Sequence, residues 1–139
     1  MSAMSDYLEQ KLIDHIFDAD DAGNWTGPST FYVELLTTAL NDAGSGGQKV
    51  TGSGYARVSV AKGTTLWTRT SGNEVSNAGI ITFPAPTGDW GQVVAFAIYD
   101  HATNDTNLLF HGTLDSAKTI NNGDPAPKFA VGQLKFTFN

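Results

Sequence analysis

Gln92-Val93-Val94-Ala95-Phe96-Ala97-Ile98-Tyr99 is apolar at almost every position, and it is the strongest indication of the fold. Side chains on a strand point alternately to its two faces, and both alternating sets of this segment are apolar. A strand of this kind is covered on both faces, as a central strand is. We therefore predict a central strand at 92–99, closely packed on the face that carries the alanines.

Strand signals continue on both sides of this segment. Residues 100–107 form a polar turn and 108–114 are again rich in apolar residues, so 92–114 is predicted to be a β-hairpin. Because no helices alternate with strands, the sequence predicts a mainly β fold, an antiparallel β-sandwich or jelly roll. In the last strand, Leu134, Phe136 and Phe138 are expected to point inward. Further strands are predicted at 31–36, 55–60, 64–68, 80–83, 118–120, 128–131 and 133–139.

One helix is predicted near the N-terminus, at about 6–17. Asp6 is expected to cap it, with Glu9 three residues later in the manner of a capping box. A helix of about 12 residues is marginal alone in water, so its apolar stripe needs a surface in this domain or in a neighbouring chain. The stripe consists of Leu8, Leu12, Ile13, Ile16 and Phe17.

The remaining organisation follows from length and composition. The 139 residues, 40% of them hydrophobic, are enough for a single domain with one core over 1–139. The segment 41–54 is rich in glycine and poor in apolar residues, which predicts a long flexible Gly-rich loop. Loops of this kind often become ordered by a partner.

Charge excludes some partners. The chain has a net charge of −6, and its eight Lys and Arg residues do not cluster along the sequence. Nucleic acids and anionic membranes attract clustered cations, so we expect neither as a partner. The chain has no cysteine, and no secretory signal is recognisable at its start.

No arrangement of residues predicts catalysis, metal binding or a cofactor. The acidic stretch Asp18, Asp20, Asp21 lacks two ligands of a calcium loop, including the bidentate one. No nucleophile elbow or phosphate loop is present. His101 and His111 are expected to flank each other across the hairpin, in a structural or solvent-facing role. The sequence therefore predicts a protein that is not an enzyme and that binds other protein surfaces.

The candidate interface residues are the helix stripe and two of the three tryptophans. Trp90 precedes the most apolar strand and is expected to close the core. Trp25 lies in a loop bounded by Gly and Pro, and Trp67 lies between threonines on a short strand. Tryptophan is enriched at binding hot spots, so either one is a good anchor if it is exposed. The protein-interface candidates are Leu8, Leu12, Ile16, Trp25 and Trp67.

The order of several segments carries a family resemblance. From about Tyr7 to the end, the chain resembles small structural proteins of tailed bacteriophages. Members of this group are often labelled tail-fibre proteins, and the general type includes capsid cement, or decoration, proteins. The segments are the helix at 7–15, then 28–39, Gly54-Tyr55-Ala56-Arg57, Ile81-Thr82-Phe83-Pro84, Asp89-Trp90-Gly91, Ala97-Ile98-Tyr99-Asp100, 107–112 and 129–134.

The resemblance implies a virion protein, made in the host cytoplasm, without catalytic residues. We predict a capsid cement protein that binds and stabilises the shell of major capsid protein at the capsid surface. Its partners would be the major capsid protein and itself, as a homodimer or trimer. Such a protein needs a stable β core, segments that become ordered on the shell, and oligomerisation. The alternative is a tail-fibre or baseplate component involved in host receptor binding. The absence of a long repetitive shaft weighs against this alternative.

Overall fold

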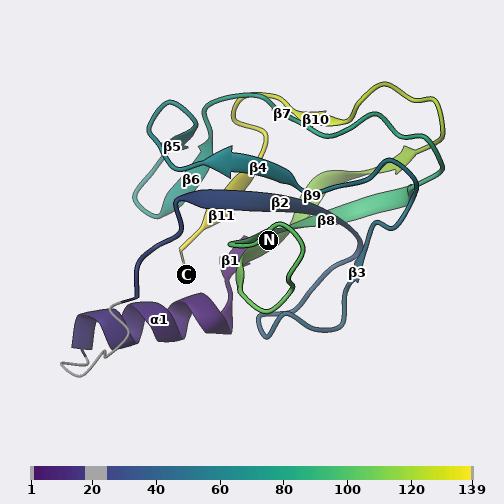
Figure 1. Ribbon diagram of the computed structural model, residues 1–139. Coiled ribbons are helices and arrows are strands. Elements are labelled where there is room, and N and C mark those ends of the chain that lie inside the picture. Colours follow the sequence, from purple (N-terminus) through teal and green to yellow (C-terminus); the bar gives the residue numbers. More distant parts are fainter. Residues whose placement is uncertain (1, 18–24, 139) are drawn as a thin grey trace.

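The central-strand prediction is confirmed by the computed structural model, which describes residues 2–17 and 25–138. The predicted strand is β8 (Gly91–Tyr99), inside a six-stranded antiparallel sheet (Figure 1). It pairs with β2 (Thr30–Thr38) on one side and with β9 (Leu108–Ile120) on the other, so the hairpin is also confirmed. The sheet is completed by β1 (Ser2–Met4), which pairs with β9, and by β3 (Gln48–Lys49) and β4 (Val58–Ala61), which pair with β2.

Two small antiparallel sheets share a core with one face of the large sheet. One contains β5 (Trp67–Arg69), β6 (Glu74–Asn77) and β11 (Lys135–Thr137), and the other contains β7 (Ile81–Thr82) and β10 (Lys128–Phe129). Phe110 of β9 meets Phe136 of β11 with ring centroids 4.4 Å apart. The fold is therefore mainly β and antiparallel, as predicted, with a sandwich of unequal sheets.

Strand β8 is buried on both faces. Phe96 and Ile98 belong to the main core between the sheets. Ala95, Ala97 and Tyr99 belong to a second cluster on the opposite face. The small alanine side chains let the residues that cover this second face approach the strand closely.

The helix α1 (Asp6–Phe17) forms as predicted, but its cap does not. Ser5, not Asp6, is the capping residue, because its hydroxyl oxygen accepts a hydrogen bond from the Leu8 N–H at 3.2 Å. The Ser5 hydroxyl also donates to the carbonyl oxygen of Leu108. The cap therefore fastens the start of the helix to β9. The helix is not long and apolar enough to cross a membrane.

The segment 41–54 is mostly turn and loop, and two of its features were not expected from its glycines. It contains β3 and the buried Val50, which is only 2% exposed. Its first turn is closed by Asn41, whose side-chain oxygen accepts a hydrogen bond from the Ser45 N–H at 2.9 Å. Gly44 has a φ of 75° and lies against the Leu108 side chain. At this position glycine permits a tight turn that a larger residue resists, rather than conferring mobility.

Some strand boundaries also differ from prediction. The predicted strand at 118–120 is the end of the long strand β9, which reaches it through an irregular stretch. Strands β1 and β6 have too few apolar residues to be recognised from sequence. In the last strand, Leu134 and Phe136 are buried as predicted, whereas Phe138 is 41% exposed.

Candidate protein-binding site

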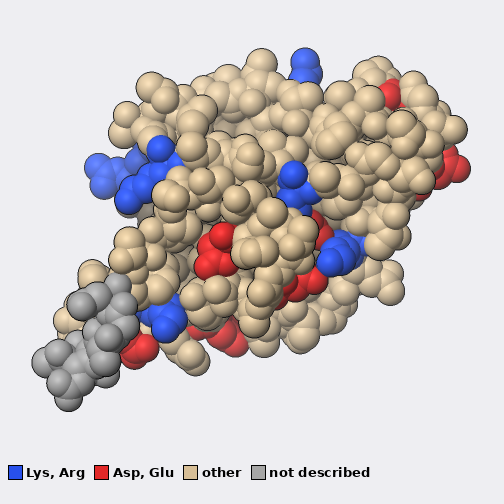
Figure 2. Space-filling view, viewed as in Figure 1, with Lys and Arg blue, Asp and Glu red and all other residues tan. Residues whose placement is uncertain are grey.

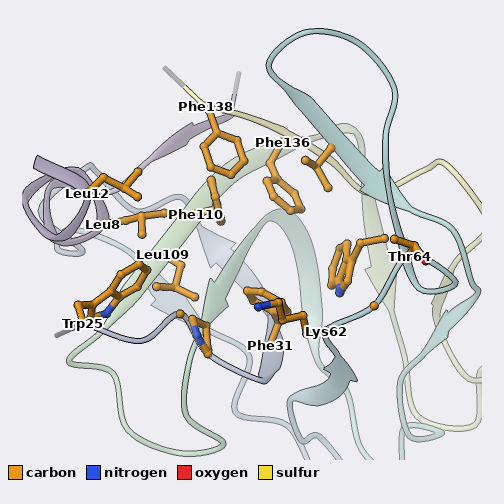
Figure 3. Close-up of a pocket in the computed structure, with 15 residues that line it drawn as sticks. Leu8, Leu12, Trp25, Phe31, Lys62, Thr64, Leu109, Phe110, Phe136 and Phe138 are labelled. Atoms are coloured by element: carbon orange, nitrogen blue, oxygen red, sulfur yellow. The ribbon is translucent and has the colours of Figure 1, made fainter. Parts of the chain in front are cut away.

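An open apolar cavity of about 420 Å³ lies between α1 and the sandwich (Figure 3). We call it the helix groove. Its lining is almost entirely apolar, and Lys62 is the charged residue among the side chains that form it. The lining residues are Leu8, Leu12, Trp25, Gly27, Pro28, Phe31, Lys62, Gly63, Thr64, Trp67, Val75, Leu109, Phe110, Phe136 and Phe138.

The helix supplies one wall of the groove. Leu8 and Leu12 are four residues apart, so they lie one above the other on the same helix face. Figure 3 shows both side chains reaching from the helix towards Leu109 and Phe110 of β9. Leu8 is buried and Leu12 is partly buried against the core.

A row of aromatic rings forms the opposite wall. Phe31 contacts Trp67 at 5.6 Å between centroids, and Trp67 contacts Phe136 at 5.7 Å. Phe110 contacts both Phe136 and Phe138, the latter at 5.0 Å. Most of these are edge-to-face contacts, which fix the rings relative to each other. The groove is therefore preformed rather than a gap between mobile side chains.

Four of the five predicted interface residues lie in this groove. Leu8, Leu12, Trp25 and Trp67 line it together, although they come from a helix, a loop and a strand. The fifth, Ile16, lies further along α1 and is 66% exposed. Neither tryptophan is fully exposed, since both are partly buried against the core. Trp90, which was expected to close the core, is 4% exposed.

The end of the helix carries a second apolar surface. Ile13, Ile16 and Phe17 are 57%, 66% and 81% exposed. Taking about 200 Å² for a fully exposed residue of this size, they offer on the order of 400 Å² of surface. We call these three residues the helix end. In Figure 1 this end of α1 points away from the sandwich.

The face shown in Figure 2 is largely uncharged, with acidic and basic atoms in small separate groups. One cluster of charged side chains is partly buried, and it is centred on Arg57. The Arg57 Nε donates to Glu34 Oε2 at 2.6 Å, and Arg57 also pairs with Asp105. Lys49 Nζ lies 2.9 Å from the other oxygen of Asp105. The Arg57 guanidinium also stacks on the Tyr99 ring, 4.0 Å from its centroid.

This cluster fastens the turn at 100–107 to the sheet. Arg57 Nη1 donates to the carbonyl oxygens of His101 and Asn104, both at 2.9 Å. Burial raises the pKa of Tyr99 to about 12, although the charge of Arg57 opposes this. Burial also raises the pKa of Tyr55, and the neighbouring Glu34 carboxylate raises it further. Except for Glu34 Oε1, which is buried without a hydrogen-bond partner among the described residues, the groups of this cluster pair with one another and have a structural role.

The predicted histidine pairing is wrong. His111 lies opposite Ala97 in the hairpin, and its Nε2 is hydrogen-bonded to Asp42 Oδ1 at 2.6 Å. His101 Nδ1 instead accepts hydrogen bonds from two N–H groups of its own turn, those of Thr103 and Asn104. Within residues 2–17 and 25–138, no three His, Cys, Asp or Glu side chains are grouped to hold a metal ion. The acidic stretch 18–21 lies outside the described residues.

Sequence reasoning missed the residues that β strands contribute to the groove. Phe110, Phe136 and Phe138 were assigned to strands, but nothing in the strand pattern places them beside the helix.

Comparison with known proteins supports a phage origin. Residues 3–137 match the family described as podophage GP4 fiber I protein gp80. No curated protein matches the chain. The family match extends from β1 through α1 to the end of β11, so it includes every residue of the helix groove except Phe138. The chain therefore belongs to the family of podophage GP4 fiber I protein gp80 and is a structural component of a tailed-phage virion.

Proposed function

We propose that this chain is a fibre subunit that works by binding protein surfaces and not by catalysis. Its first partner would be a second copy of itself. The observation that carries the proposal is the placement of a preformed apolar groove beside an exposed apolar helix end on one chain. The family description, which names a fibre protein, favours the fibre over other virion locations.

The two surfaces complement each other chemically. The helix end presents three large apolar side chains, and the helix groove is lined by aromatic and aliphatic ones. If each copy places its helix end on the groove of another, both surfaces are buried on every chain. On the estimate above, the helix end contributes on the order of 400 Å² per chain, and the groove with its surroundings must supply the rest of the roughly 800 Å² per partner of a standard stable interface.

Symmetry limits the assemblies that this contact can form. Helix end and helix groove are different patches, so two copies can exchange them reciprocally in a homodimer. The same contact made head to tail can also close into a trimer. In both the dimer and the trimer, the helix end of every chain is covered by the groove of another chain.

A second candidate is a capsid cement protein that binds the major capsid protein at the capsid surface. The low charge of the chain, with 16% charged residues, favours this candidate because a weakly hydrated surface is readily covered by a shell. It would use the same groove and helix end, with the shell as an additional partner.

The two locations predict different amounts of protein in purified virions. Quantitative mass spectrometry should give the ratio of this chain to the major capsid protein. A ratio far below one, together with antibody labelling at the tail, is expected for the fibre. A ratio near one, with labelling over the head, would favour the cement protein. Absence of the chain from purified virions would contradict both.

A further inference from the structure

A second open cavity, of about 230 Å³, concentrates positive charge on an acidic protein. It is lined by Lys118 of β9, Lys128 of β10 and Lys135 of β11. We call it the lysine pocket. The whole chain has eight Lys and Arg residues and a net charge of −6, so three of the eight cations meet here. The cations that appear unclustered along the sequence are therefore clustered by the fold.

An irregularity of β9 shapes the pocket. In the pairing of β8 with β9, Val93 lies opposite Lys118 and Ala95 lies opposite Thr113. Four residues of β9, 114–117, thus face a single residue of β8, and the chain bulges at this point. Bulges of this kind re-aim side chains and are common beside functional sites. Residues 114–116 of the bulge line the pocket.

Among residues 2–17 and 25–138, none of the three lysines forms an ion pair with an acidic side chain. In the described chain, the ion pairs engage Lys49, Arg57 and His111, and none engages Lys118, Lys128 or Lys135. Asp115 also lines the pocket without forming an ion pair there. Three lysines and one carboxylate leave the pocket with a net charge of +2, and a bound anion reduces the repulsion among the lysines.

The rest of the pocket suits a sugar ring. Phe96 and Leu134 are buried and Phe129 is half-buried, so they give the cavity an apolar floor. Ser116 on the bulge is exposed and adds a hydroxyl to the rim. An apolar floor with a polar rim fits a ring that has C–H groups on its face and hydroxyls on its edge. The volume is below the roughly 300–1,000 Å³ of pockets for drug-sized ligands, which limits the ligand to about one monosaccharide.

We propose that the lysine pocket binds an acidic monosaccharide unit, carrying a carboxylate or a phosphate, of a bacterial surface polysaccharide. This biological role rests on the proposed fibre function. Lysine attracts either anion as a point charge, without the planar geometry that arginine imposes. Binding by one pocket is weak, and an oligomer multiplies it by presenting several pockets to one polymer.

The test is a titration of the ¹⁵N-labelled full chain followed by NMR. The probes are glucuronate and glucose 6-phosphate, with glucose as the neutral control and inorganic phosphate and a hexaglutamate peptide as competing anions. The acidic sugars should shift the amide signals of Lys118 and Phe129 saturably, and glucose should not. In Lys128→Gln the affinity should fall at least about tenfold, because a charge-assisted contact is lost. The matched variant Arg69→Gln, which removes an exposed charge on β5, should bind like the wild type.

Four results would overturn the proposal. The first is that glucose binds as tightly as the acidic sugars, and the second is that inorganic phosphate binds as tightly as glucose 6-phosphate. The third is that hexaglutamate binds more tightly than both acidic sugars. The fourth is that Lys128→Gln and Arg69→Gln lose the same amount of affinity for the acidic sugars. Loss of solubility in Lys128→Gln without any sugar binding by the wild type would also contradict it. The lysines would then serve only to protect an open strand edge. Because the pocket lies outside the helix groove, the oligomeric mass of Lys128→Gln reports separately on the proposed function.

Discussion

Arg57 holds together three parts of the molecule. Its guanidinium pairs with Glu34 on β2, donates to backbone carbonyls of the turn at 100–107, and stacks on Tyr99 at the end of β8. Glu34 is 2% exposed, and the Arg57 guanidinium is the cation that pairs with its buried carboxylate. A buried ion pair of this kind adds little net stability, but loss of one partner leaves an uncompensated charge.

Removal of Arg57 should therefore be strongly destabilising. We expect Arg57→Met to lower the free energy of unfolding by about 3–5 kcal/mol. The double variant Glu34→Gln/Arg57→Met should recover a large part of this loss, because it removes the buried charge and keeps an acceptor for the Tyr55 hydroxyl. Urea unfolding measures both values. A double variant no more stable than the single one would refute the assigned role.

Asp105 should make stability depend on acid pH. Burial raises its pKa, but the Lys49 hydrogen bond and the Arg57 charge outweigh this and hold the pKa below its ordinary value of 3.8. A carboxylate with a lowered folded-state pKa stabilises the fold above its unfolded-state pKa, and this contribution is lost as the pH falls through the folded-state value. Unfolding midpoints in urea should decline below about pH 4, and the decline should be shallower in Asp105→Asn. If the urea midpoints of the wild type and of Asp105→Asn decline equally at low pH, Asp105 does not contribute to the pH dependence of stability.

At the scale of elements, α1 shows what the sequence can and cannot predict. The spacing of Leu8, Leu12 and Ile16 was enough to predict the helix and its bounds. It could not predict that only the first half of the stripe meets the sandwich. That outcome depends on where the sheets end, which is set by pairing between strands distant in sequence, such as β1 with β9.

The exposed half of α1 should be needed for assembly and not for folding. Ile16→Asp is expected to dissociate the oligomer with little change in the urea midpoint, because it places a charge in the proposed interface. Ile80→Asp is the matched control, since Ile80 is 60% exposed and lies outside the helix groove. Leu12→Asp should lower both stability and assembly. Sedimentation velocity compares the masses, and equal behaviour of Ile16→Asp and Ile80→Asp would contradict the assignment.

The loop at 41–54 should respond to substitution like a part of the core. A Cβ at Gly52 would lie 2.5 Å from the Asp89 carbonyl oxygen and would also collide with the Trp90 ring. The Trp90 Nε1 donates to the Ser53 carbonyl oxygen at 2.9 Å, so this ring is fixed. We expect Gly52→Ala to lower the free energy of unfolding by about 1–3 kcal/mol, and Gly72→Ala, with open space around it, to be nearly neutral. If Gly52→Ala leaves the free energy of unfolding unchanged, the loop can move away from Asp89 and Trp90, and the prediction is wrong.

Glycine content alone did not reveal how this loop contacts the sheet. Its five glycines suggested flexibility, whereas one apolar residue, Val50, and the pairing of β3 hold it to the sheet. Strand β6 was missed for a related reason, because Ser76 and Asn77 are polar residues that are nevertheless buried. Asn77 satisfies its side chain with backbone groups, including the Leu134 N–H at 2.9 Å, and such pairing leaves no periodic signal.

At the scale of the whole molecule, the sequence predicted the class of fold and the phage family but not the surfaces. The continuous apolar run at 92–99 and the alternation at 133–139 depend only on neighbouring residues, so both can be recognised directly. The helix groove and the lysine pocket each combine three or more elements, and their formation depends on the strand order. The clustering of Lys118, Lys128 and Lys135 is the clearest case, because their spacing along the chain gave no sign of it.

The two kinds of surface have separate proposed roles on one small chain. The helix groove and helix end supply contacts between copies, while the lysine pocket, built from β9, β10 and β11, stays outside that contact. An assembly made through the helix would therefore leave its pockets open.

The mass of the purified wild-type chain in solution tests self-association most directly. Multi-angle light scattering after size-exclusion chromatography should give two or three times the chain mass of 14.8 kDa, at every concentration well above the dissociation constant. A monodisperse species of 14.8 kDa at the highest concentration reached would contradict the account, because the helix end would then have no partner in a second copy.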